Sequence, residues 1–121
     1  MASPIIRAAT REDIQSFSRM PDTPTMRAIL IEKDGNIIAM GGVFRKNDRW
    51  FAFCDLRDEV RSHKTTLMRA GKKMVDMVGS MGIRFMYAYP DPEEPRSALW
   101  LMSLGFEPDG NVRDLYRWRS V

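Results

Sequence analysis

Cysteine and histidine are almost missing from this chain of 121 residues, which has one of each, Cys54 and His63. A single cysteine excludes an intrachain disulfide and a cysteine-based metal site. A single histidine leaves a histidine-rich metal site without ligands, so we expect no bound metal. Cys54 stands in the aromatic, apolar segment WFAFCDL, where we expect a buried, unreactive thiol rather than a nucleophile.

Long apolar runs are also missing, and none approaches the roughly 18 to 20 residues of a membrane span. The opening residues, MASPIIRAATRED, have no apolar segment after a basic start, so we expect no secretory signal and a cytoplasmic protein. The length suits one domain, residues 1–121, with one hydrophobic core. Hydrophobic residues at 44% and charged residues at 29% are usual for a globular protein.

Hydrophobic patterning predicts the order β-α-β-β-β-α-β-α-β-β. The expected strands lie in residues 4–10, 28–32, 37–44, 50–56 and 83–89, and a final hairpin over residues 106–120 turns at Asp109-Gly110-Asn111. Three helices are expected. The first begins at Thr10 and ends near Met20, the second runs from Ser62 to Ser80, and the third covers residues 96–104. This order favours a mixed sheet with helices on both faces.

Short local signals support several of these elements. Thr10 followed by Asp13 predicts a capping box, and Asp34-Gly35 predicts a tight hairpin turn. Gly41-Gly42 inside a strand predicts either a bulge or the close approach of another backbone. Gly82 is expected to end the long helix.

The long helix carries an apolar stripe at helical spacing: Leu67, Gly71, Met74, Val78 and Met81. Its first turn is polar and basic, with the sequence RSHKTT at residues 61–66. Helix N-termini attract anions, and the net charge of +3 also favours an acidic ligand. An anion site is therefore expected there, although its first glycine, Gly71, lies inside the helix.

The element order, together with GNIIAMGGV on the third strand and SALWLMSLGFEPDG near the end, resembles the GNAT superfamily of N-acyltransferases. The opening IIRAATREDI and the closing LGFEP look like the corresponding family segments, and the resemblance covers nearly the whole chain. It implies an α/β (α+β) fold with a mainly antiparallel central sheet. The short form is similar to GNAT-like proteins encoded by bacteriophages.

The resemblance implies acetyl-CoA as co-substrate, lying against the fourth strand with its pyrophosphate at the start of the next helix. The cofactor-binding residues that it implies are Leu56, Arg57, Arg61, Ser62, His63, Lys64, Thr65 and Thr66. The family's loop contains glycines; here the loop keeps Arg61 and has none.

The resemblance also directs attention to the catalytic positions. The family often has a tyrosine four residues before the glycine of LGF, acting as general acid, and here that position is Leu101. Tyr87 and Tyr89 are the nearest substitutes, although both are also explained as sheet aromatics. Asp55 is the best general base for an ammonium substrate. Asp58 and Glu59 are alternatives, and a solvated surface charge is the structural explanation for any of the three.

Three functions remain open. The first is acetyl transfer to an amine, on a small molecule or a protein, in a site left open by the short linker RMPDTPT. The second is a GNAT-fold structural, virion or interaction module without catalysis, favoured by Leu101 and the glycine-free loop. Nucleic-acid binding through the helix's basic residues and Arg117-Trp118-Arg119 is weaker. The tryptophans Trp50, Trp100 and Trp118 offer surface for a homodimer.

Overall fold

The computed structural model describes residues 3–18 and 25–120, and its centre is one seven-stranded sheet in the order β1-β2-β3-β4-β5-β7-β6. Five of the neighbouring pairs are antiparallel, and the β4–β5 pair is parallel. The strands are β1 (Ile5–Ala8), β2 (Arg27–Lys33), β3 (Asn36–Lys46), β4 (Arg49–Leu56), β5 (Phe85–Ala88), β6 (Glu107–Pro108) and β7 (Tyr116–Arg119). The expected mixed, mainly antiparallel sheet is confirmed.

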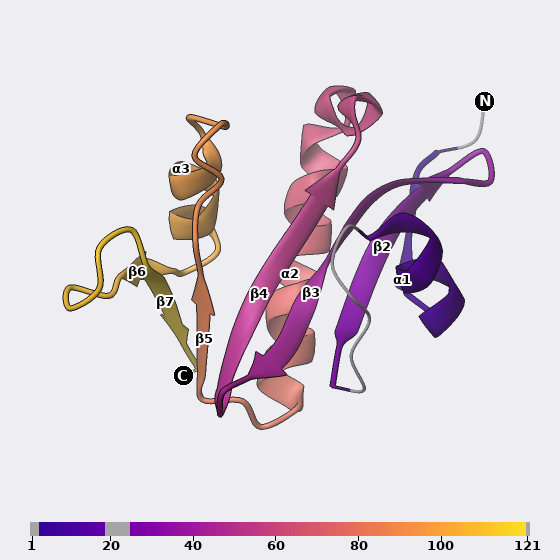
Figure 1. Ribbon diagram of the computed structural model, residues 1–121. Helices are drawn as coiled ribbons and strands as arrows, with labels where there is room; N and C mark the ends of the chain where they lie inside the picture. The colour runs from indigo at the N-terminus through magenta and orange to yellow at the C-terminus, as the bar shows by residue number, and fades with distance from the viewer. Residues whose placement is uncertain (1–2, 19–24, 121) are drawn as a thin grey trace.

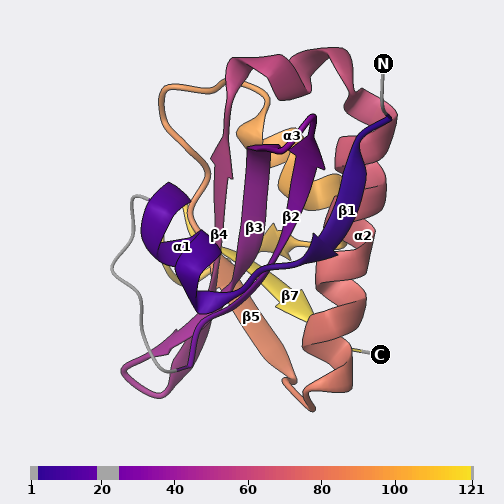
Figure 2. The same ribbon diagram turned by 90° about the vertical axis from the view of Figure 1, so that its right-hand side faces the viewer.

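Helices cover both faces of this sheet (Figures 1 and 2). The α-helices are α1 (Arg11–Phe17), α2 (Lys64–Ser80) and α3 (Ser97–Ser103), and η1 (Asp58–Ser62) is a 3₁₀ turn. Alternate residues of β2 divide between the faces, since Ala28 and Leu30 pack with Ile14 of α1. Ile29 and Ile31 pack in the larger cluster with α2 and α3. This period of two is why one strand can serve two hydrophobic layers.

The hairpin turns agree with the sequence. Asp34 and Gly35 join β2 to β3 with φ values of 52° and 81°, and Asn47 and Asp48 join β3 to β4 with φ values of 52° and 63°. Two successive residues with positive φ give the turn whose twist matches the flanking strands. The predicted antiparallel meander is therefore confirmed.

The glycine pair in β3 marks a close approach and not a bulge. An ideal Cβ on Gly42 would lie 2.1 Å from the carbonyl oxygen of Arg27, so the β2 backbone needs this position empty. The irregularity is elsewhere, because Ile31 pairs with Ala39 and Glu32 with Ile37. The extra residue between them is on β3, three positions before the glycines.

One end each of α1 and α2 differs from the predictions, and so does the placement of Met81. α1 ends at Phe17 and not near Met20, and residues 19–24 lie outside the described residues. α2 begins at Lys64 and not Ser62, because residues 58–62 form η1, held to the core by buried Val60. Met81 is 39% exposed because it follows the helix as its C-cap. Gly82, with φ of 77°, ends the helix as expected.

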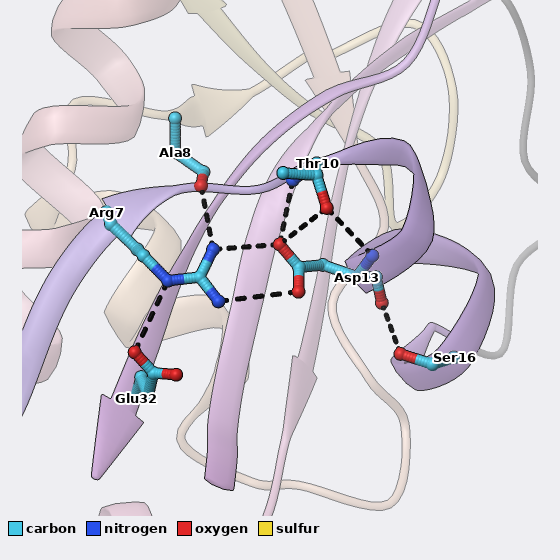
Figure 3. Close-up of polar contacts among 6 residues, drawn as sticks. All are labelled: Arg7, Ala8, Thr10, Asp13, Ser16 and Glu32. Atoms are coloured by element: carbon cyan, nitrogen blue, oxygen red, sulfur yellow. Dashed lines mark hydrogen bonds and ion pairs between the residues drawn. The ribbon is translucent and has the colours of Figure 1, made fainter. Parts of the chain in front are cut away.

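A polar network joins β1, α1 and β2 (Figure 3). The Thr10 hydroxyl accepts the Asp13 backbone N–H at 3.1 Å, and Asp13 Oδ2 accepts the Thr10 N–H at 2.8 Å, which confirms the capping box. The Arg7 guanidinium lies 2.8 Å from Asp13 Oδ2 and 3.3 Å from Glu32 Oε2. Hydrogen bonds from Arg7 and Thr10 hold the pKa of Asp13 well below its usual range.

This network predicts acid-sensitive stability. Asp13 has a lower pKa in the folded than in the unfolded chain, so its stabilisation is complete above about pH 4 and is lost as the pH falls further. Asp13→Asn should lower the free energy of unfolding by about 1 kcal/mol at pH 7, a value that allows for solvent screening of Arg7. Urea unfolding of both proteins from pH 7 to 2.5 should show this difference shrinking with acidification. A difference independent of pH would contradict the assignment.

Candidate site at the split between β4 and β5

The sheet is split between its two parallel strands. β4 and β5 pair only at Phe51 and Tyr87, and Figure 1 shows them diverging toward the carboxyl end of β4. A cavity of about 130 Å³ lies there, and residues of the sheet, α2 and α3 line it. Members of both hydrophobic clusters contribute, among them Met74 of α2 and Phe53 of β4. Brief pairing of parallel strands thus opens a site inside a continuous sheet.

The β4 backbone presents hydrogen-bonding groups to this gap. The N–H of Arg57 donates to Ile38 O of β3 at 2.9 Å, which sets which residues face β3. Successive residues of a strand direct their backbone groups to opposite neighbours. Cys54 and Leu56 therefore direct their N–H and C=O groups toward β5, beyond the single paired position. An extended polar chain can pair with this edge as a further strand would.

The first turn of α2 presents a second set of donors. The first backbone hydrogen bond of α2 is donated by the Leu67 N–H to His63 O at 2.9 Å. Within residues 3–18 and 25–120, no carbonyl accepts the N–H groups of Lys64, Thr65 or Thr66. These donors lie at the positive end of a 17-residue helix. The turn can receive an anion without moving the main chain.

Basic side chains at this turn come from three elements: Lys33 from β2, Arg61 from η1 and Lys64 from α2. Lys33, at the end of β2, places its Nζ 3.3 Å from His63 Nε2, next to the N-cap of α2. Sequence reasoning missed Lys33, since only sheet pairing brings it to this helix. Arg61 is paired with Glu94 at 3.6 Å and with Asp58 at 3.7 Å, and Ser62 donates to Glu59 O at 3.1 Å. Those two side chains must change partners to meet a ligand.

Leu56, the last residue of β4, and Arg57, directly after it, were both predicted to bind the cofactor. Their side chains lie on different sides of the sheet. Leu56 is 50% exposed and lines the cavity. The Arg57 guanidinium lies 4.7 Å from the ring centre of Phe17 in α1, and its N–H is used by β3. Arg57 therefore faces α1, away from the first turn of α2.

The predicted catalytic side chains lie apart. Tyr89 is 60% exposed and lines the cavity, as does buried Leu101. Asp55 is half-buried, accepts a hydrogen bond from Ser18 Oγ at 3.1 Å, and is not among the lining residues. It shares a strand face with Phe53, which packs in the α1 cluster. An acceptor that uses Asp55 must approach from the α1 side, across the split from the α2 side of the cavity.

Cys54 is exposed at the cavity, so its expected burial was wrong. Its side chain lies on the same face of the sheet as that of Ile29, and no β5 residue is paired beside this part of β4. Surrounding protein nevertheless limits hydration, and this desolvation, with a smaller effect of Asp55, raises the pKa of its thiol to about 12. The neutral thiol is a poor nucleophile at pH 7.

Other placements bear on partners. Trp118 is buried in β7, and Trp50 and Trp100 pack against the core, which leaves less aromatic surface for a second copy than expected. Among the described residues, no group of three or more His, Cys, Asp or Glu is placed to hold a metal ion. No helix in the same part of the chain is long and apolar enough to span a membrane.

The fold has well-matched relatives among solved structures. No protein-family model and no curated protein sequence matches the chain. The ribosomal-protein-S18-alanine N-acetyltransferase from Escherichia coli superposes with a TM-score of 0.70 at 11% identity, covering 97% of this chain and 94% of its own. An N-acetyltransferase from Staphylococcus aureus Mu50 gives 0.72 at 14% identity, covering 98% and 99%.

A GNAT-family acetyltransferase from the same S. aureus strain gives a TM-score of 0.70 at 12% identity, covering 97% of this chain and 99% of its own. At such low identity the similarity establishes architecture and leaves chemistry open. The expectation drawn from the sequence is confirmed at this level: the chain has the fold of the GNAT N-acetyltransferases.

Proposed function

We propose that this protein is an acetyl-CoA-dependent N-acetyltransferase that modifies an amine on a small molecule or a protein. One observation carries the proposal: among the described residues, β4 has backbone groups left unpaired by the split from β5, and α2, which follows β4 through η1, begins with N–H groups that no carbonyl accepts. An extended arm that ends in a diphosphate fits both features, since the arm pairs with β4 and the diphosphate meets Lys64, Thr65 and Thr66.

The proposed reaction is direct acyl transfer. The lone pair of a neutral amine attacks the thioester carbonyl, a C–N bond forms, and the C–S bond breaks with its electron pair leaving on sulfur. Asp55, or water, takes the proton from the attacking nitrogen. Tyr89, exposed at the cavity, is the donor proposed for the departing thiolate. Holding the two substrates in line supplies much of the rate.

Acetyl-CoA binding tests the proposal with a charge placed at the helix start. By isothermal titration, the wild type should bind acetyl-CoA with a Kd between micromolar and low millimolar, or about 4 to 8 kcal/mol. Thr65→Glu should weaken binding at least about tenfold because its carboxylate repels the diphosphate. A glutamate in the first turn is favourable for the helix, so lost folding would not explain that result.

Thr65→Gln is the matched control, with nearly the same size and no charge, and it should bind within about threefold of the wild type. Equal weakening by both variants would move the diphosphate away from this turn. If low-millimolar acetyl-CoA produces neither heat nor a rise in melting temperature, the transferase proposal is wrong.

A GNAT-fold module without catalysis is the second candidate. It is supported by Leu101, which is buried, lines the cavity and has no proton to donate. The glycine-free turn supports it too, because β-branched Thr65 and Thr66 restrict the backbone more than glycine. Binding of acetyl-CoA without turnover on any amine would favour this candidate. Three further expectations from the sequence remain proposals. They are a bacteriophage origin, a virion or cytoplasmic location, and a homodimer.

A further inference from the structure

The cavity extends far beyond the strands that form its opening. At the open end lie exposed Tyr89 and Asp91, with Ser97 and Trp100. From there it runs beneath α2, past Cys54 on β4 and Gly41 on β3, to Ile29 on β2. Its inner end is buried and apolar, where Ile31, Ala39, Ala70 and Met74 have relative exposures of 1%, 3%, 6% and 4%. The shape is a blind apolar pocket with a polar opening.

Gly41 contributes space to this pocket. The sheet register aligns Ile29, Gly41 and Cys54 in one row across β2, β3 and β4. Gly41 needs no positive φ, and a Cβ built there would meet only one heavy atom of the described residues within 4 Å, Phe53 O at 3.6 Å. Gly42 differs, since its Cβ would clash with β2. The backbone would therefore accept a side chain at position 41, and the missing side chain leaves space beneath α2.

We infer that the acyl group of the donor is a longer apolar chain, of about four to six carbons, and that Gly41 sets this preference. The inference rests on the site and the acyl transfer of the proposed function and changes only the preferred acyl group, from acetyl to a longer chain, because the pocket continues inward from the strand edge where the thioester would lie. An acetyl group would leave the inner end empty. The volume of about 130 Å³ is close to that of an engineered apolar cavity, roughly 150 Å³, that holds benzene.

The pocket lining selects this chemistry. Its inner residues are aliphatic side chains and methionine, and no charged side chain among the described residues lines that end. Burying an acyl chain removes apolar surface from water, and each buried methylene strengthens binding about fourfold. A charged acyl group, such as one ending in a carboxylate, would lose its hydration there without a partner. The expected donor is thus an uncharged, apolar acyl thioester of coenzyme A.

Isothermal titration with acetyl-, butyryl-, hexanoyl- and decanoyl-CoA tests this. Hexanoyl-CoA should bind at least about tenfold tighter than acetyl-CoA, and the gain should stop before decanoyl-CoA because the pocket is closed. Equal affinity for acetyl- and hexanoyl-CoA would overturn this inference and leave the proposed function intact. No binding of any of the four would overturn both.

Gly41→Leu fills the pocket and should bring the ratio of acetyl-CoA to hexanoyl-CoA dissociation constants down toward 1. Gly79→Leu is the matched control, because Gly79 is exposed on α2 with no heavy atom of the described residues within 4 Å of an added Cβ. That variant should keep the wild-type ratio. If Gly41→Leu does not fold, Gly41→Ala should still lower the ratio by a factor of about two to four. An unchanged ratio in a folded Gly41 variant would remove Gly41 from the inference.

Discussion

Gly42→Ala should destabilise the protein by at least about 3 kcal/mol, a large fraction of the stability usual for a domain of this size. The added methyl carbon would lie 2.1 Å from Arg27 O, 2.7 Å from Ala28 Cα and 2.8 Å from Ala28 Cβ. Two of these atoms belong to the backbone of β2, which cannot rotate away as a flexible side chain would. β2 and β3 must separate at the centre of the sheet, and their hydrogen bonds must lengthen.

Gly41→Ala is the control one residue away. Its Cβ has ordinary contact distances, and replacing glycine also reduces the entropy of the unfolded chain. Its free energy of unfolding should be unchanged or higher by up to about 1 kcal/mol. Chemical denaturation of the two variants beside the wild type measures both values. Equal stability of the two alanine variants would show that β2 does not approach Gly42 this closely.

Phe106→Ala should lower the free energy of unfolding by about 3 to 5 kcal/mol. Phe106 has the largest side chain among the fully buried residues, with 2% exposure, and it lies in the cluster shared by α2, α3 and the sheet. Its N–H donates to Leu101 O at 3.1 Å, which fixes the chain where α3 ends. Removing the ring leaves a cavity that neighbours on two helices and the sheet cannot all move to fill.

Phe85→Ala separates this effect from the loss of any phenylalanine. Phe85 is 39% exposed on β5, and its ring lies 5.5 Å from the Arg117 guanidinium. Its replacement should cost about 1 kcal/mol or less. Thermal and urea unfolding should therefore rank the variants with Phe106→Ala far below Phe85→Ala. A reversed order would place the core elsewhere.

Local patterns in the sequence were sufficient for the order of elements. Asp34-Gly35 and Asn47-Asp48 impose their turns through positive φ, which depends on neighbouring residues alone. Thr10 and Asp13 form their capping box within one helical turn. In each case the interacting groups are three residues apart or fewer, so no long-range contact was needed to infer the structure.

The candidate site was less predictable because it is made by contacts between distant segments. Residues 57–63 are an example. Val60 is buried in the core, and the five residues from Asp58 to Ser62 form the 3₁₀ turn η1 around it. Lys33 reaches His63 because α2 packs against β2, and Arg57 turns to Phe17 because of strand alternation. Cys54 stands in an apolar run, yet it is exposed because β5 diverges from β4 beside it. Sequence periodicity contains no information on where two strands part.

The sheet consists of two parts that are joined at one parallel pair of residues. Strands β1 to β4 and strands β5, β7 and β6 are connected by backbone pairing only at Phe51 and Tyr87 in the described part of the chain, so side-chain contacts and helix packing supply the rest of their connection. Gly71 of α2 is part of that packing, because a Cβ there would lie 2.9 Å from Leu104, the C-cap of α3, and 3.2 Å from Trp100 of α3. One bridge restrains the relative orientation of the two parts less than the longer antiparallel ladders within each part do.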